Sequence, residues 1–214
     1  IWLGLVGSEM CIRDRDTPGL LLFLLGNENN YGLFWSGAET EDFPEGDEKK
    51  KFIGERLGRP MYKLMNDAAI KMKSINNNLP IAICNGDLLF VEIIAEECTD
   101  VDIYGTNMYR GKSFSDAFER VKKELDMPIL FTEFGADAFN AVSNQEDQKM
   151  QAFYMVENWK EIYQNAAGLG KAGNAIGGFT FQFSDGWWKY GQTKNLEVHD
   201  NNASWSNRGY YLDI

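Results

Sequence analysis

Short apolar runs alternate with stretches of helical periodicity along most of the chain. The runs have the length of buried strands, and they lie at Leu20–Leu25, Ile81–Cys84, Val101–Asn107, Ile129–Thr132 and Ile176–Phe183. Helical patterns separate them at about 50–74 (with a break near Pro60), 88–98, 113–125 and 147–168. Five strands joined by four helix-bearing connections predict an α/β fold with a parallel sheet and right-handed crossovers.

Two of the expected helices follow capping signals. Ser113 with Asp116 predicts one helix start, and Ser143 with Glu146 predicts the start of the long helix near residue 147. Apolar spacing on that long helix predicts one buried face, made of Ala152, Met155, Val156, Trp159, Ile162 and Tyr163.

Composition narrows the classes of ligand. The 214 residues suffice for one domain with a sizeable core, and 32 acidic against 21 basic residues give a net charge of -11. This charge argues against nucleic acid or an anionic membrane as partner, since both require clustered Lys and Arg, but it allows a neutral carbohydrate. The chain has one histidine, His199, which argues against a histidine triad and against multi-histidine metal sites. Its three cysteines lack metal-ligand spacing, and they do not indicate whether the protein occupies a reducing or an oxidising compartment.

Two glutamates stand at the ends of apolar runs. Glu28 follows Leu20–Leu25, and Glu133 follows Ile129–Thr132. Carboxyl ends of parallel strands share one edge of a sheet, where α/β enzymes place their sites. Two carboxyl groups are what hydrolysis of a glycosidic bond needs, because one protonates the leaving oxygen while the other attacks the sugar or activates water.

Four strand-end motifs, in order, resemble the (β/α)8 catalytic domain of glycoside hydrolase family 2 and its wider clan of retaining glycosidases. They are Gly26-Asn27-Glu28 (strand four), Asp102–Tyr109 (strand six), Thr132-Glu133-Phe134-Gly135 (strand seven) and Gly177–Phe181 (strand eight). The resemblance implies a partial TIM barrel, strands four to eight with their helices, that hydrolyses β-linked sugars by double displacement. This chemistry requires no cofactor.

The resemblance also implies residue roles. Glu133 would be the nucleophile, oriented by Tyr109, and Glu28 would be the general acid/base, while Asn27 would bind the sugar 2-hydroxyl. Further substrate-binding residues would be Asn107 and the aromatic residues Phe181, Trp187 and Trp188.

The chain departs from the family pattern in two ways. Phe181 stands where the clan usually has a tryptophan that floors the sugar site. Strands one to three of the family's barrel have no counterpart here. The resemblance therefore implies two missing partners, namely the N-terminal half of the barrel and upstream β-sandwich domains. We therefore expect the chain expressed alone to be poorly soluble or inactive, because its sheet edge and core would be open. Clean monomeric behaviour with full glycosidase activity would contradict this.

Residues 1–15 do not fit this pattern. The segment from Gly4 to Arg15 resembles a translated adapter from a transposon-type sequencing library, and it has no signal-peptide features. We therefore expect residues 16–214 to be the native part, belonging to the C-terminal portion of the catalytic domain. The alternative is a natural strand before a turn at Asp16–Gly19.

Other interpretations stay open. A transglycosylase would use the same two glutamates, and a non-catalytic carbohydrate-binding protein would keep the fold and the aromatic loop. A different α/β enzyme would hold the glutamates far apart. Glu28 also fits a simple turn, because it lies between Asn27 and Asn29. Trp187 and Trp188 equally fit a role in packing their loop.

Overall fold

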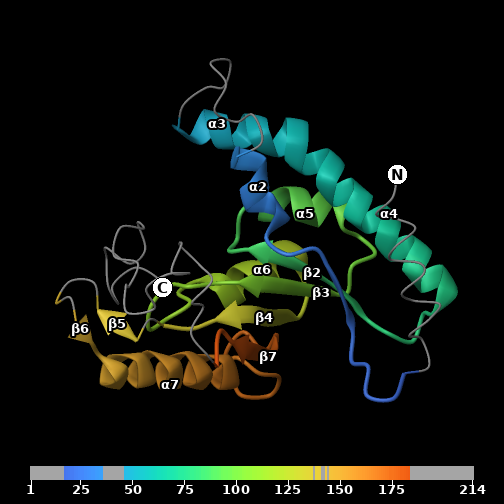
Figure 1. Ribbon diagram of the computed structural model, residues 1–214. Helices are drawn as coiled ribbons and strands as arrows, with labels where there is room; N and C mark the ends of the chain where they lie inside the picture. Colours follow the sequence, from blue (N-terminus) through green and yellow to red (C-terminus); the bar gives the residue numbers. More distant parts are fainter. Residues whose placement is uncertain (1–16, 36–45, 137, 141–142, 144, 184–214) are drawn as a thin grey trace, which may run out of the picture. The chain divides into compact units, whose positions relative to one another are not determined.

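The computed structural model describes residues 17–35, 46–136, 138–140, 143 and 145–183 (Figure 1). The strands are β1 (Phe23–Leu25), β2 (Ile81–Gly86), β3 (Ile103–Asn107), β4 (Ile129–Phe134), β5 (Phe139–Asn140), β6 (Gln145–Glu146) and β7 (Ala175–Thr180). The helices are α2 (Asn29–Trp35), α3 (Gly46–Ile53), α4 (Arg59–Ile75), α5 (Val91–Glu97), α6 (Ala117–Leu125) and α7 (Gln148–Gln164), with a π-helical segment, Gly54–Gly58, between α3 and α4.

Five strands form the predicted sheet in the order β1-β2-β3-β4-β7. Each of these strands is therefore hydrogen-bonded to the sheet strand that precedes it in the chain. β1 and β2 are parallel, with Phe23 opposite Ile81 and Leu25 opposite Ile83. Every residue of β2 and β3 is buried, as expected of parallel strands covered on both faces. The sequence prediction of an α/β parallel sheet is confirmed, although β1 is shorter than the apolar run at Leu20–Leu25 that predicted it.

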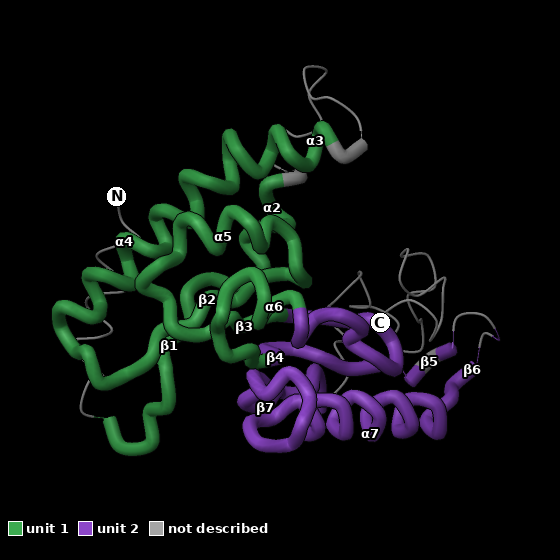
Figure 2. Tube along the Cα trace, turned by 180° about the vertical axis from the view of Figure 1, so that it is seen from behind, with its two compact units in different colours: residues 1–106, 120–130 green, residues 107–119, 131–214 purple. Residues whose placement is uncertain are grey.

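The chain divides into two compact units, coloured separately in Figure 2. Unit 1 comprises residues 1–106 and 120–130, and unit 2 comprises residues 107–119 and 131–214. In unit 1, Ala82, Ile103 and Leu130 pack together as a core cluster of three neighbouring strands.

The predicted break in the long N-terminal helical stretch lies just before Pro60. The π-helical segment Gly54–Gly58 interrupts the helix there, and Pro60 occupies the first turn of α4. Proline is tolerated at this position because its missing N–H would have no partner within the helix. A β-carbon on Gly54 would lie 2.9 Å from carbon atoms of both Ile93 and Phe90, so this glycine allows the π-helical segment to approach α5 closely.

Phenylalanine rings form the centre of unit 2. Phe114 stacks on Phe131 with ring centroids 4.0 Å apart, and it meets the edge of Phe134 at 5.8 Å. Phe118 completes the cluster, 5.4 Å from Phe131. All four residues are at most 1% exposed.

The predicted cap of α6 is wrong. The helix begins at Ala117 and not directly after Ser113 as the predicted box requires. The Ser113 hydroxyl donates to Glu161, and the Asp116 carboxylate accepts from Arg110. A residue of α7 thus binds Ser113, and a residue of the same loop binds Asp116.

The predicted capping box of α7 is also wrong. Glu146 pairs with Phe139 in the β5–β6 ribbon instead of lying in the helix. Asp147 is the N-cap, and its side chain accepts from the backbone N–H of Met150 at 3.1 Å. This is an ordinary aspartate cap, one residue after the glutamate of the predicted box.

The buried face of α7 differs from the predicted one. Its buried residues are Tyr154, Asn158 and Ile162, whereas Val156 is 51% and Tyr163 is 69% exposed. Trp159 is also exposed, although its ring meets that of Phe134 edge-on at 5.2 Å. Of the six predicted residues only Ile162 is buried.

The two described cysteines, Cys84 and Cys98, are both buried. Burial raises the pKa of Cys98 to about 12, so its thiol stays protonated and acts as a small apolar side chain. Within the described ranges, no group of His, Cys, Asp or Glu has a metal-binding arrangement, and no helix is long and apolar enough to cross a membrane.

Candidate active site

Glu28 lies in the tight turn between β1 and α2. Its φ of 50° is left-handed, which is uncommon for a residue other than glycine. Its backbone N–H donates to the Cys84 carbonyl at 2.9 Å, and its own carbonyl accepts from Tyr31 at 3.0 Å. β2 and the start of α2 thus fix the backbone of this half-buried glutamate. Such a constrained position at a strand end is typical of functional residues.

The same turn depends on two asparagines and a glycine. Asn30 is 1% exposed and exchanges two hydrogen bonds with Gly86, accepting from its N–H at 2.7 Å and donating to its carbonyl at 2.8 Å. Gly26 has a φ of 74°, and a β-carbon there would overlap the Asn29 side chain. Asn30 was not predicted to have a structural role, because nothing in the run Asn27-Glu-Asn-Asn30 distinguishes it from the other two asparagines.

Asn27 is exposed and adjoins Glu28. Its side-chain oxygen accepts from the Cys84 thiol at 3.3 Å, and its N–H donates to Asn29 at 3.0 Å. The side chain is thus held at the carboxyl end of β2.

A buried polar network lies next to this turn, at the end of β2. The Asn85 side chain accepts from the Tyr62 hydroxyl at 2.7 Å and donates to the Tyr104 hydroxyl and the Asp87 carbonyl. Burial raises the pKa of Tyr62 above its usual value, so its hydroxyl remains a donor. Because Asn85 is only 3% exposed and has several partners, it fixes the loop after β2.

Glu133 belongs to unit 2 and is the next-to-last residue of β4. The Tyr109 hydroxyl donates to Glu133 Oε2 at 2.9 Å, and the Met108 N–H donates to the Glu133 carbonyl at the same distance. The carboxylate is half-buried. The predicted pair of Tyr109 and Glu133 is thus brought together, with the phenol directed at a carboxylate oxygen.

Asn107 lies at the end of β3 and is 1% exposed. Its side-chain oxygen accepts from the Thr132 hydroxyl at 2.6 Å. Thr132 precedes Glu133 in the quoted motif, but no contact of its own was predicted for it. The contact orients the Asn107 amide group beside the strand that carries Glu133.

Phe181 follows β7 and lies beside the end of β4. Its N–H donates to the Phe134 carbonyl at 2.8 Å. A β-carbon on Gly135 would overlap the Phe181 carbonyl oxygen, so a glycine is required after Phe134. The half-buried ring thus belongs to the same unit as Glu133. Trp187 and Trp188, the other predicted aromatic residues, lie outside the described residues.

The predicted site residues therefore fall into two groups. Asn27 and Glu28 lie in unit 1, and Asn107, Tyr109, Glu133 and Phe181 lie in unit 2. Each of them lies in the last two residues of its own strand or in the segment that follows it. A carboxylate with a phenol donor can attack a carbon centre or accept a proton, and a second carboxyl group can act as acid and base.

Comparison with known proteins gives matches in structure alone. No protein-family model matches the chain, and no curated protein matches it. A Bacteroides uniformis β-glucuronidase superposes with a TM-score of 0.59 at 15% identity, covering 85% of this chain and 21% of that one. A family 2 β-galacturonidase from Eisenbergiella tayi, bound to galacturonate, gives a TM-score of 0.53 at 16% identity, covering 84% of this chain and 29% of that one.

A third structure is the B. uniformis β-glucuronidase 2, covalently bound to cyclophellitol-6-carboxylate aziridine. It gives a TM-score of 0.57 at 16% identity and covers 85% of this chain. The chain spans only 21% to 29% of the length of these three proteins. The parallel sheet with its helices is thus an α/β fold shared with glycoside hydrolases, consistent with part of a (β/α)8 barrel.

Proposed function

We propose that residues 16–214 are the C-terminal part of the catalytic domain of a retaining glycoside hydrolase that acts on β-linked sugars, and that residues 1–15 are foreign to it. Glu133 is the nucleophile and Glu28 the general acid/base. The observation that carries this proposal is the hydrogen bond from the Tyr109 hydroxyl to Glu133 Oε2, at 2.9 Å. It lies at the carboxyl end of a strand in a fold shared with glycoside hydrolases, where parallel-sheet enzymes place their reacting groups.

The reaction proceeds in two displacements. A Glu133 carboxylate oxygen attacks the anomeric carbon and forms a glycosyl ester, while Glu28 gives its proton to the departing glycosidic oxygen. Glu28 then removes a proton from water, and the water oxygen displaces Glu133 from the anomeric carbon. The Tyr109 hydroxyl keeps the attacking carboxylate in one orientation, so that one of its oxygens faces the sugar.

Asn27 and Asn107 are proposed to bind sugar hydroxyls, and the Phe181, Trp187 and Trp188 rings to pack against apolar sugar faces. The matched structures support a β-glycoside as substrate, since they are named β-glucuronidases and a β-galacturonidase.

Covalent labelling tests the nucleophile. A cyclophellitol-type aziridine, the class of molecule bound covalently in one matched structure, should add one inhibitor mass to the intact enzyme. Peptide mapping should place the adduct on Glu133. Glu133→Gln should abolish labelling, whereas the same change at Glu119, an exposed residue of α6, should leave it unchanged. An adduct on another residue would refute the assignment.

Removing the Tyr109 hydroxyl tests the contact that carries the proposal. Tyr109→Phe should lower kcat/KM by about 10- to 100-fold, the value of a hydrogen bond to a charged group. Steady-state kinetics with an aryl β-glycoside measure this. Tyr163→Phe removes a hydroxyl from a side chain that is 69% exposed on α7, and should change nothing. Equal rates for wild type and Tyr109→Phe would exclude a role for this contact.

A further inference from the structure

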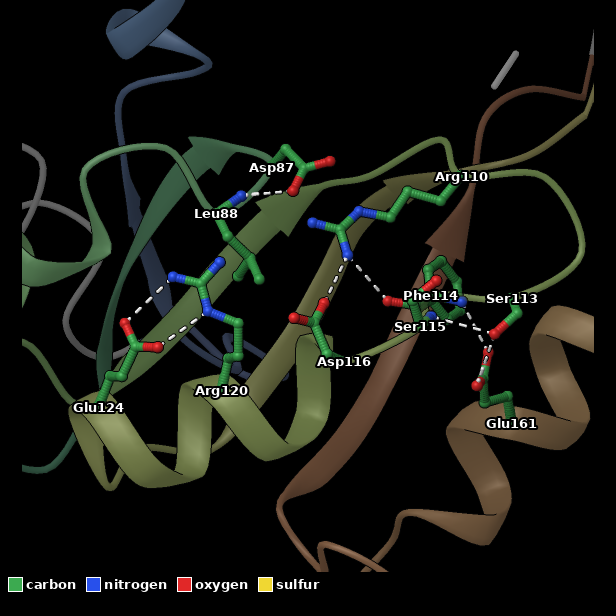
Figure 3. A network of polar contacts seen from close by, with 10 residues as sticks. All are labelled: Asp87, Leu88, Arg110, Ser113, Phe114, Ser115, Asp116, Arg120, Glu124 and Glu161. Atoms are coloured by element: carbon green, nitrogen blue, oxygen red, sulfur yellow. Dashed lines mark hydrogen bonds and ion pairs between the residues drawn. The ribbon is translucent and has the colours of Figure 1, made fainter. Parts of the chain in front are cut away.

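The loop of residues 108–116 connects β3 to α6 and carries Tyr109. Glu161 of α7 binds this loop with both carboxylate oxygens (Figure 3). Oε1 accepts from the Ser113 hydroxyl at 3.0 Å, and Oε2 accepts from the Phe114 N–H at 2.7 Å. Hydrogen bonds to a charged acceptor are the stronger kind, so this one side chain fixes two consecutive loop residues.

Two further polar side chains of α7 bind neighbouring loops. Asn158 is 1% exposed, and its amide donates to the Gly111 carbonyl at 3.0 Å. Asn158 and Glu161 are three residues apart and share one side of the helix. Gln151 donates to the Ala136 carbonyl at 3.0 Å, in the segment that follows Glu133. These side chains therefore hold the segments that follow β3 and β4.

The 108–116 loop is also closed on itself (Figure 3). Arg110 donates to the Phe114 carbonyl at 3.0 Å and to Asp116 at 3.1 Å. The Ser115 N–H donates to the Ser113 hydroxyl at 3.0 Å. The Arg110 guanidinium thus binds the second half of the loop. The Ser113 hydroxyl accepts a hydrogen bond within the loop and donates one to Glu161.

Phe114 couples the loop to the strand of the nucleophile. Its ring stacks on Phe131 and meets Phe134 edge-on. In β4, Phe134 directly follows Glu133, and Phe131 precedes the Thr132–Glu133 pair. Glu161 binds the backbone of this same Phe114. A shift of the loop would therefore disturb both the Phe114 packing and the position of Tyr109.

We propose that Glu161 is a positioning residue, which acts through the 108–116 loop to keep the Tyr109 hydroxyl on Glu133. The inference rests on the proposed function, since it assigns Glu161 a part in the same reaction. A displacement of about 1 Å at a reacting group can cost about 100-fold in rate. A helix that fixes the loop at Gly111, Ser113 and Phe114 limits such displacement.

A carboxylate is required because the loop presents two donors. Glutamine has one side-chain oxygen, and its NH2 group would face either the Phe114 N–H, which cannot accept, or the Ser113 hydroxyl, which would have to accept where it now donates. Glu161→Gln therefore keeps the size of the side chain, removes the charge that strengthens both hydrogen bonds, and loses or reverses one of them. Glu157→Gln is the matched control, because Glu157 lies on the same helix and pairs with the exposed Lys160.

The test combines hydrogen exchange with kinetics in the intact enzyme. Glu161→Gln should raise amide exchange in peptides covering residues 108–116 by at least about tenfold, while peptides from β2 and α4 stay unchanged. It should lower kcat by about 10- to 100-fold with little change in KM. In a Tyr109→Phe background the same substitution should change kcat by less than about threefold, because the residue through which it acts is gone.

Three results would overturn the inference: unchanged exchange in the loop, an unchanged kcat, or an equal loss of kcat with and without the Tyr109 hydroxyl. If Glu161→Gln does not fold, Ser113→Ala replaces it and should give a smaller effect of the same kind. If the wild-type enzyme neither cleaves β-glycosides nor takes the aziridine label, the proposed function fails. In that case, amide hydrogen exchange of the Glu161→Gln variant still tests whether Glu161 holds the loop.

Discussion

Glu133→Gln is expected to abolish release of sugar from aryl β-glycosides by the intact enzyme. Glutamine has nearly the same shape and can still accept from the Tyr109 hydroxyl, but its amide oxygen is a poor nucleophile. The loss should be on the order of 10⁶-fold in kcat, as when a covalent nucleophile is removed from another enzyme. Initial rates with a chromogenic substrate, followed over hours, measure it.

The control for this substitution is Glu119→Gln, which makes the same change of charge on the exposed side of α6. It should retain wild-type rates. The Glu133→Gln protein should keep the wild-type melting temperature, because the contact between Met108 and Glu133 uses backbone atoms. Turnover at more than a few per cent of the wild-type rate would exclude Glu133 as the nucleophile.

Glu28→Ala is expected to have an effect that depends on the leaving group. Loss of a general acid should cost about 10²- to 10⁴-fold for a substrate whose leaving oxygen must be protonated. A dinitrophenyl glycoside should lose far less in its first step, because its leaving group departs as an anion. Added azide should restore turnover, since it attacks the glycosyl enzyme without giving up a proton. Kinetics with a series of aryl glycosides, with and without azide, measure both effects.

The matched control is Glu48→Ala, which removes an exposed carboxylate from α3. The rates of this variant should equal those of the wild type with every leaving group, and azide should not change them. A Glu28→Ala enzyme that loses activity equally on all substrates, without rescue by azide, would indicate that Glu28 only shapes the turn after β1. The left-handed φ of Glu28 makes this distinction important, because a change of residue there also alters the turn.

Local pattern was sufficient for the strands of the five-stranded sheet, but it missed the short β5–β6 ribbon. β2, β3 and β4 follow from continuous apolar runs, since strands buried on both faces need apolar side chains throughout. Strand order places the segments of Tyr109 and Glu133 after neighbouring strands, but the pairing of these two side chains was implied only by the family resemblance.

Polar contacts between distant segments could not be predicted. Asn30, Thr132 and Asn158 are each bound to a partner more than 20 residues away, and single residues of these types give no signal of burial. The same effect misled the prediction for α7, whose apolar residues Val156 and Tyr163 are exposed while Asn158 is buried. Side-chain pattern indicates a helix, but which side faces the protein depends on its neighbours.

The sequence by itself thus determined the order of the five sheet strands, the helices that connect them, and the placement of two glutamates at strand ends, but not α2 or the β5–β6 ribbon. It could do so because burial and backbone geometry impose periods that adjacent residues reveal. Only the tertiary structure decided that the Tyr109 hydroxyl meets Glu133 and that Glu161 holds the loop between β3 and α6. Such contacts join segments far apart in the chain, and they form only where packing brings a donor within about 3 Å of an acceptor.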